Sequence, residues 1–314
     1  MKKKLTAFLA VLLVLCLCMT GCFGPKAEQG ESSVTPLLYR VTDQNGNVLW
    51  LFGSIHVGTE NYYPLPDYVL DAFDGSDALA VELDIMAMEW NFVQQTQLMQ
   101  LLIYTDGSTI TDHLSQQTYE RGVEILRENN AYNESMDFYM PAMWWSMIES
   151  FGMEKMGVKT SLGIDRHLLK RARSDGKPVR EVESAEFQYA IMAGFSPALQ
   201  QILLEGAIYS YDNLEESKAD MEKMIALWSS GDEAAFAAYL NQETEITDPE
   251  EAALYQEYND GLITQRNQTM TEYAEAALLS GEEIFLCVGA AHIVGEGAIA
   301  QNLRQMGYQV EIVQ

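Results

Sequence analysis

Two apolar runs near opposite ends of the chain finish in the same short pattern. Residues 49–58 are LWLFGSIHVG and residues 284–295 are IFLCVGAAHIVG; each has a strand-length apolar run, a Gly-x-x-His and another glycine within three residues. An apolar run of that length bounded by glycine is typical of a buried central strand. Open α/β folds place their ligands beyond the carboxyl ends of such strands. We therefore expect His56 and His292, two of the 4 histidines in the chain, to meet at one site.

The rest of the hydrophobic pattern predicts an α+β fold, with a mixed β-sheet core surrounded by many helices. Asn45-Gly46 lies between the first two apolar runs and predicts a hairpin. The expected strands cover residues 37–41, 48–52, 78–84, 177–183, 284–288 and 308–313. Apolar residues at helical spacing predict helices over residues 67–73, 112–129, 141–156, 163–173, 197–209, 214–229, 232–241, 249–279 and 296–306. The last strand–helix–strand succession predicts a terminal βαβ unit with His292 in its first turn.

The first 21 residues (1–21) have the composition of a secretory signal. Three lysines precede an apolar run over residues 7–19, which is short for a transmembrane helix. The ending Thr-Gly-Cys22 resembles a bacterial lipobox, which implies cleavage before Cys22 and lipid attachment to its sulfur. An uncleaved signal anchor and plain secretion are the alternatives. Residues 22–36 are then a polar flexible tether, and we expect an extracytoplasmic protein anchored to a bacterial membrane through Cys22.

Cysteine content and charge narrow the chemistry and the partners. Cys16 and Cys18 leave with the signal and Cys22 carries the lipid, so only Cys287 remains in the folded part. No intramolecular disulfide is then possible, and Cys287, inside an apolar run, is expected to be a small buried hydrophobe. The formal net charge of −27 repels nucleic acid and anionic head groups, so we expect no nucleic acid partner.

Glu82 adds a carboxylate to the two histidines. It lies in the apolar run 78–84, where a buried carboxylate needs a cation or hydrogen-bond donors; a sheet face partly open to water is the alternative. Two imidazoles and a carboxylate suit a transition metal better than magnesium. A catalytic metal keeps one position open for water and lowers the pKa of that water. Spacing alone leaves structural histidines open as well, because a single Gly-x-x-His is common.

The paired Gly-x-x-His motifs resemble the TraB/GumN family, which is related to the Tiki metalloproteases. The resemblance covers residues 37–314, which we take as one TraB/GumN domain. Its motifs follow the family's order: Gly53-Ser54-Ile55-His56, Pro64-Leu65-Pro66, Val81-Glu82-Leu83-Asp84, Gly163-Ile164-Asp165, Gly176-Lys177-Pro178-Val179 with Glu183, Trp228 with Gly231-Asp232, Arg266-Asn267 and Gly289-Ala290-Ala291-His292. Ala290-Ala291 stands where relatives often have Ala-Gly, a difference that is harmless or narrows the approach to His292.

The resemblance implies a divalent transition metal, manganese, cobalt or zinc, as the cofactor. His56, His292 and Glu82 fall on the family's metal-binding positions, and Glu82 has the alternative role of base on the metal-bound water. Gly53 and Gly289 fall on the motif glycines and are expected to support the site. In the Tiki relatives this arrangement implies hydrolysis of peptide bonds.

Three further positions are carried over from the family with less specific roles. Arg266 matches the family arginine, which implies a contact with a substrate carboxylate or a developing oxyanion; a structural ion pair is the alternative. Asp165 and Glu183 match motif positions and are expected to cap a helix or to hold a ligand residue in place. His113 and His167 match no motif, and we interpret both as surface or structural residues.

The resulting hypothesis is a membrane-anchored, extracytoplasmic, metal-dependent hydrolase that acts on peptides. The alternative, from a different class, is a non-catalytic surface lipoprotein that binds or sequesters a peptide or haem, since some family members restrain peptide signals. The expected partners are therefore a peptide or small-molecule ligand and the membrane itself, through the lipid on Cys22.

Overall fold

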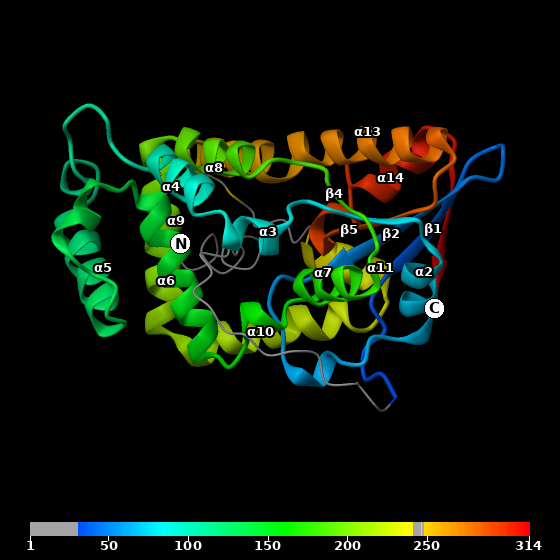
Figure 1. The fold of residues 1–314 in the computed structure, drawn as a ribbon. Coiled ribbons are helices and arrows are strands. Elements are labelled where there is room, and N and C mark those ends of the chain that lie inside the picture. Colours follow the sequence, from blue (N-terminus) through cyan, green and yellow to red (C-terminus); the bar gives the residue numbers. More distant parts are fainter. Residues whose placement is uncertain (1–30, 241–245, 247) are drawn as a thin grey trace.

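The structure is a computed structural model that describes residues 31–240, 246 and 248–314. Within these residues a mixed sheet of six strands lies at one side of the molecule, in the order β4-β3-β5-β2-β1-β6 (Figure 1). The strands are β1 Leu38–Thr42, β2 Val48–Ser54, β3 Ala78–Val81, β4 Val179–Glu181, β5 Ile284–Gly289 and β6 Gln309–Val313. The predicted α+β class with a mixed sheet and many helices is confirmed.

The sheet is built from a hairpin and a parallel half. Strands β1 and β2 pair antiparallel, and Gly46 in the loop between them has a φ of +87°, which favours glycine. Strands β2, β5, β3 and β4 run parallel to one another. Strand β6 pairs antiparallel with β1 and so runs parallel to β5, to which α14 (Ile299–Gln305) connects it. The terminal βαβ unit therefore forms as predicted, with β2 and β1 lying between its two strands.

The position of each strand in the sheet follows from its composition. Every residue of β5 is buried, which explains its continuous apolar run between two parallel neighbours. Strand β4 carries Arg180 and Glu181 and lies at the edge of the sheet. Strands β3, β5 and β2 are neighbours in the middle of the sheet, so the sequence motifs that follow their carboxyl ends lie side by side.

The helices divide between the sheet and a second core. They are α2 Asp67–Gly75, α3 Ile85–Trp90, α4 Phe92–Leu101, α5 Gln116–Glu128, α6 Pro141–Lys155, α7 Ile164–Asp175, α8 Ala185–Gly194, α9 Pro197–Asp212, α10 Leu214–Trp228, α11 Glu233–Leu240, α12 Pro249–Asn259, α13 Gln265–Ser280 and α14. In Figure 1, α5, α6 and α9 lie opposite the sheet, while α13 and α10 run along the top and bottom of the view.

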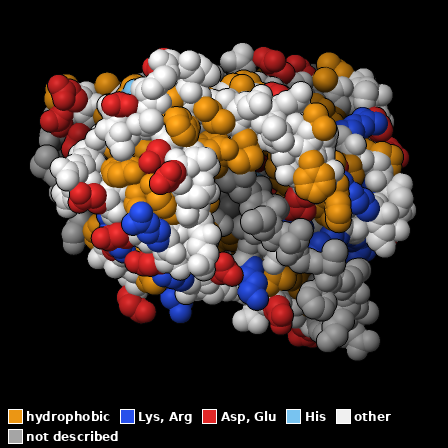
Figure 2. Space-filling model, turned by 60° about the vertical axis from the view of Figure 1, so that its left-hand side comes forward, with side chains coloured by type: hydrophobic (Ala, Val, Ile, Leu, Met, Phe, Trp, Pro, Cys, Tyr) orange, Lys and Arg blue, Asp and Glu red, His pale blue; other side chains and the backbone are white. Residues whose placement is uncertain are grey.

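Two large apolar cores correspond to these two regions. The sheet region packs β2, β3 and β5 against parts of α2, α7, α13 and α14 around residues such as Phe52 and Phe285. The helical region packs α5, α6, α8, α9 and α12 around Trp144 and Trp145, which are core residues as their apolar surroundings predict. Figure 2 shows one face of the molecule, on which acidic side chains are spread among apolar ones.

Several elements differ from their predicted bounds. The expected helix 249–279 forms as α12 and α13, joined through a π-helical segment, Asp260–Thr264. The expected helix 296–306 begins only at Ile299, because Gly295 and Gly297 both have positive φ. The expected strand 78–84 ends at Val81, so Glu82 lies just beyond the sheet instead of inside the strand.

The predicted signal at residues 1–21 and the lipid site at Cys22 lie outside the described residues. The described end of the expected tether, residues 31–36, contacts the fold: Val34 is buried, and the Thr35 N–H donates to the Ser229 carbonyl oxygen at 2.9 Å. In the described part of the chain, none of the helices combines the length and the apolar composition that crossing a membrane requires.

Candidate functional site

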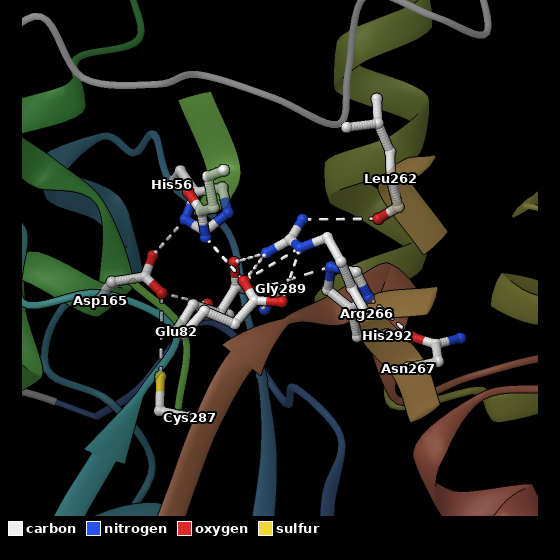
Figure 3. A network of polar contacts seen from close by, with 12 residues as sticks. His56, Glu82, Asp165, Leu262, Arg266, Asn267, Cys287, Gly289 and His292 are labelled. Carbon is white, nitrogen blue, oxygen red and sulfur yellow. Dashed lines mark hydrogen bonds and ion pairs between the residues drawn. The ribbon is translucent and has the colours of Figure 1, made fainter. Parts of the chain in front are cut away.

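Three parallel strands bring the predicted metal ligands together. Ser54 at the end of β2 pairs with Gly289 at the end of β5, and Val81 at the end of β3 pairs with Cys287 of β5. His56, Glu82 and His292 therefore follow the same edge of the sheet, as Figure 3 shows. The expectation that the two histidines, 236 positions apart, share one place with Glu82 agrees with this geometry: His292 Nε2 lies 4.0 Å from Glu82 Oε1.

Gly289 leaves the space between these side chains open. A Cβ atom at this position would lie 3.2 Å from Glu82 Oε1, 3.4 Å from His56 Nε2 and 3.5 Å from His292 Cδ2. The three side chains therefore surround one point above the glycine backbone. Gly53 is required for packing, because a Cβ atom there would lie 2.5 Å from the Cδ1 atom of Ile293. Both motif glycines are thus explained by close approach of neighbouring groups.

His56 is held by a carboxylate. Its Nδ1 lies 2.8 Å from Asp165 Oδ2, and the other oxygen of Asp165 accepts the Ser54 hydroxyl at 2.5 Å. A carboxylate can only accept, so the Asp165 contact places the proton of neutral His56 on Nδ1 and leaves Nε2 as the lone-pair nitrogen. Asp165 lies in the first turn of α7 and holds the ring of His56.

His292 is held in the same way by an amide. Its Nδ1 lies 2.7 Å from Asn267 Oδ1, and the Asn267 Nδ2 group donates to the Gly297 carbonyl oxygen at 2.9 Å, which sets the orientation of the amide. Nε2 is again the nitrogen that faces Glu82. Burial and, after it, the charge of Arg266 lower the pKa of His292 to about 3, so the imidazole is neutral at neutral pH.

Glu82 is an ionised carboxylate inside the protein. Its Oε1 accepts the Gly289 N–H at 2.5 Å, and its Oε2 accepts from Arg266 Nη2 at 2.5 Å. Burial by itself raises the pKa of Glu82, but the charge of Arg266 and the hydrogen bond from the Gly289 N–H outweigh it and hold that pKa well below its ordinary value. Glu82 thus has both the cation and the donor that a buried carboxylate needs.

Arg266 is buried and joins two carboxylates. Besides Glu82, it binds Glu183 from Nε at 3.0 Å and from Nη2 at 2.7 Å, and Glu183 also accepts from Gln188 Nε2 at 2.8 Å. The π-helical segment just before Arg266 adds one residue to that turn, and the Leu262 carbonyl oxygen there accepts from Nη1 at 3.5 Å. This geometry corresponds to the structural ion pair; contact of Arg266 with a substrate remains a prediction.

Some supporting residues had no assigned role in the sequence. In the sequence, Asn267 is marked only as the neighbour of Arg266 in a family motif, and Ser54 only as the second residue of a Gly-x-x-His. Trp228 donates its indole N–H to the Gly53 carbonyl oxygen at 2.8 Å and so attaches α10 to the first motif. Asn267 contacts His292, 25 positions away, and Trp228 contacts Gly53, 175 positions away, so no local pattern predicts either contact. Only their place in family motifs indicates that they matter.

The other histidines lie away from this edge. His113 stacks on Tyr104 with ring centroids 4.3 Å apart, and His167 stacks on Tyr63 at the same separation. Both observations agree with structural roles. Cys287 is a buried free thiol with its Sγ 4.0 Å from Asp165 Oδ1, and burial raises its pKa well above the ordinary value.

The site can be tested for its fit to the divalent metal that the family implies. Both imidazoles present Nε2 toward Glu82, and each Nδ1 is held by an oxygen acceptor, the usual support of a metal-binding histidine. Two donors about 2.1 Å from one tetrahedral ion lie about 3.4 Å apart, so His292 Nε2 and Glu82 Oε1, 4.0 Å apart, would approach each other by a few tenths of an ångström to share it. The kind and direction of the donors therefore fit. Among the described residues, however, no three such side chains form a ready-made metal-binding group.

Comparison with known proteins agrees with the motif pattern. The model of the TraB/PrgY/gumN family matches residues 37–312. The "uncharacterized protein YbaP" of Escherichia coli K12 is 26% identical over 256 residues, which cover 81% of this chain and 87% of the relative. YbaP of Shigella flexneri has the same identity and coverage. No solved structure matches the chain. The match of the family model over nearly the whole described fold shows that this chain belongs to the TraB/PrgY/gumN family.

Proposed function

We propose that the protein is a metal-dependent hydrolase that cleaves peptide bonds, with the ion held by His56, His292 and Glu82. The observation that carries the proposal is the convergence of these three side chains over Gly289, with both histidine rings held through Nδ1 by an oxygen acceptor. A purely structural histidine needs no such open point, and a glycine that keeps it open is a specific requirement of a ligand site.

The bound ion would lower the pKa of a coordinated water toward neutrality and polarise the substrate carbonyl. The residues of the chain prepare this chemistry. His292 is kept as a neutral donor, and Asp165 and Asn267 hold the rings of His56 and His292 in place. Glu82 serves as an anionic ligand rather than as a base, because a carboxylate with a strongly lowered pKa is a poor acceptor of a proton.

Arg266 acts through Glu82 in this proposal. Its single positive charge is shared between Glu82 and Glu183, which offsets part of the cost of burying two acids. It also limits how much negative charge Glu82 offers to an ion. Arg266 is therefore a positioning residue whose removal alters the site without removing a donor atom.

We also propose that the protein works outside the cytoplasm, held to a membrane by lipid on Cys22. The support is the sequence of the first 22 residues, where a charged start and an apolar run precede Thr-Gly-Cys22. Replacement of Cys22 by Ala should release the protein from the membrane fraction. Retention of the variant in that fraction would contradict the lipid anchor.

One observation favours a second candidate, the non-catalytic capture of a peptide or haem. Both oxygens of Glu82 already accept hydrogen bonds, and no complete metal-binding group is present among the described residues. A binding protein needs the open point above Gly289 without needing an ion there. The two candidates differ in whether ligand binding requires metal.

Elemental analysis of the purified, unsupplemented protein, followed by peptide cleavage with and without a chelator, tests the proposal. We expect about one equivalent of a divalent transition metal and cleavage that the chelator abolishes. His56→Ala should lose both, while His113→Ala, a histidine of the helical region, should keep both. Peptide binding that persists in His56→Ala without metal or cleavage would establish capture instead.

A further inference from the structure

A small cavity lies between α6, α9 and α10, next to the candidate site. Its volume is about 50 Å³, the space of a few water molecules, so it can take the end of a side chain but not a folded partner. Val57, which follows His56 in the chain, forms part of its wall. The cavity therefore begins one residue from a proposed metal ligand.

Glu149 of α6 lines this cavity and is an unusual group there. It is 5% exposed, and among the described residues neither of its carboxylate oxygens has a hydrogen-bond partner. Burial raises its pKa well above the ordinary value. A buried acid without a donor is unfavourable for folding, and such groups in proteins call for a specific explanation.

The rest of the wall has the chemistry of a site for a positively charged group on an apolar stem. Glu216 and Asp220, one turn apart on α10, add two more acids. The apolar part is rich in flexible methionines, which adapt to varied shapes: Met153, Met156, Met221 and Met224. Within the described part of the chain, neither lysine nor arginine lines the cavity to neutralise the acids.

Tyr258 is a second buried polar residue that feels the charge of Glu149. Its hydroxyl is fully buried and has no hydrogen-bond partner among the described residues. Burial raises the pKa of this hydroxyl, and the charge of Glu149 adds to the effect.

We propose that this cavity binds an alkylammonium group, with Glu149 as its counter-ion and the methionine side chains around its stem. If the protein is a peptidase, this cavity is part of its substrate pocket, and this part of the inference rests on the proposed function. The enzyme would then prefer peptides that place a primary amine near the cleaved bond. The amine comes from a lysine side chain or from a free peptide amino terminus, which share this chemistry.

Titration of the full-length protein with n-butylammonium tests the inference, with n-butanol as the neutral match. Methyl-labelled methionine gives an NMR signal from the cavity wall, and a chelator keeps metal chemistry out of the measurement. We expect the signals of Met153, Met156, Met221 and Met224 to shift with butylammonium and hardly with butanol. Glu149→Gln should weaken butylammonium binding at least about tenfold, because it removes the charge that faces the ammonium.

Glu154→Gln is the matched control, since Glu154 lies on the same helix but is exposed. It should bind butylammonium like the wild type. Should Glu149→Gln fail to fold, Glu149→Leu provides the same comparison with an apolar side chain of similar size. Equal shifts with butylammonium and butanol, or unchanged affinity in either Glu149 variant, would overturn the inference.

Two peptides identify the source of the amine. One has an acetylated amino terminus and a lysine; the other has a free amino terminus and norleucine in place of that lysine. If only the lysine peptide competes with butylammonium, the cavity binds a lysine side chain. If only the peptide with the free amino terminus competes, the cavity binds that terminus. Cleavage without butylammonium binding overturns this inference alone, whereas butylammonium binding without metal or cleavage leaves it standing and removes the peptidase proposal.

Discussion

The sheet region and the helical region each bury a glutamate and give it opposite surroundings. Glu82, at the sheet edge, accepts from the Gly289 N–H and from Arg266, each at 2.5 Å, and its pKa is held below the ordinary value. Glu149, in the helical region, is equally buried, but its oxygens have no partner among the described residues and its pKa is raised. Burial therefore does not decide the charge of an acid; its partners do.

The difference also separates two kinds of site. Around Glu82 the fold itself supplies the partners, from a strand end and from the turn that follows a π-helical segment. Glu82 is therefore charged without any ligand, which suits the binding of a permanent ligand such as a metal ion. Around Glu149 the partner is missing from the described chain, which suits a group that arrives with a ligand and leaves with it.

Arg266→Leu should have the largest effect on stability, because it leaves Glu82 and Glu183 buried without their cation. We expect the free energy of unfolding to fall by about 3–5 kcal/mol, measured by urea denaturation at neutral pH. In the wild type the lowered pKa of Glu82 contributes stability above about pH 4.5, its unfolded value, and loses it on acidification. The gap between variant and wild type should therefore shrink at low pH; a gap that widens there would contradict the assignment.

Asp165→Asn should weaken the proposed metal site without removing a ligand. The amide can present its N–H₂ group to His56 Nδ1, which favours the tautomer with the proton on Nε2. We expect the affinity for Co²⁺, measured by titration of its visible absorption, to fall by about 10–100-fold. His113→Ala should leave the affinity unchanged. Equal Co²⁺ binding by Asp165→Asn and the wild type would show that the orientation of His56 is immaterial.

Glu149→Leu should stabilise the protein, the opposite of what removing a partnered charge does. Replacement of a buried acid without a partner should add about 1–3 kcal/mol to the free energy of unfolding. The raised pKa of Glu149 means that the wild type loses stability as the pH rises above about 4.5, its unfolded value, toward the folded value. Urea denaturation across this range should show that the gain grows with pH; a constant gain would mean that folding does not raise the pKa of Glu149.

Gly289→Ala should have the smallest effect on stability of these substitutions, while it blocks the candidate site directly. The backbone of Gly289 has a φ of −54°, which alanine adopts without strain, so we expect a loss below about 1 kcal/mol in thermal unfolding. The added methyl group would occupy the point between Glu82, His56 and His292. Metal binding and peptide cleavage should both drop sharply. Retention of both in Gly289→Ala would place the reaction elsewhere.

Much of the fold and of the site was accessible from local patterns. Apolar runs bounded by glycine predicted the central strands, and the repeated Gly-x-x-His predicted that His56 and His292 meet. Helix bounds near residues 260 and 296 were wrong for identifiable reasons. A π-helical segment keeps the helical periodicity almost unchanged, and a helix start displaced by Gly295 and Gly297 depends on their backbone conformation.

The sequence by itself determined the strand that each histidine follows, the glycines beside them and the family to which the chain belongs, because all of these are written in short, local stretches. The tertiary structure decided the partners: Asn267 contacts His292, Arg266 binds both Glu82 and Glu183, and Glu149 has no partner among the described residues. Hydrogen bonds and charges act over a few ångströms in space. Residues that meet at those distances come from helices and strands whose packing no local pattern specifies.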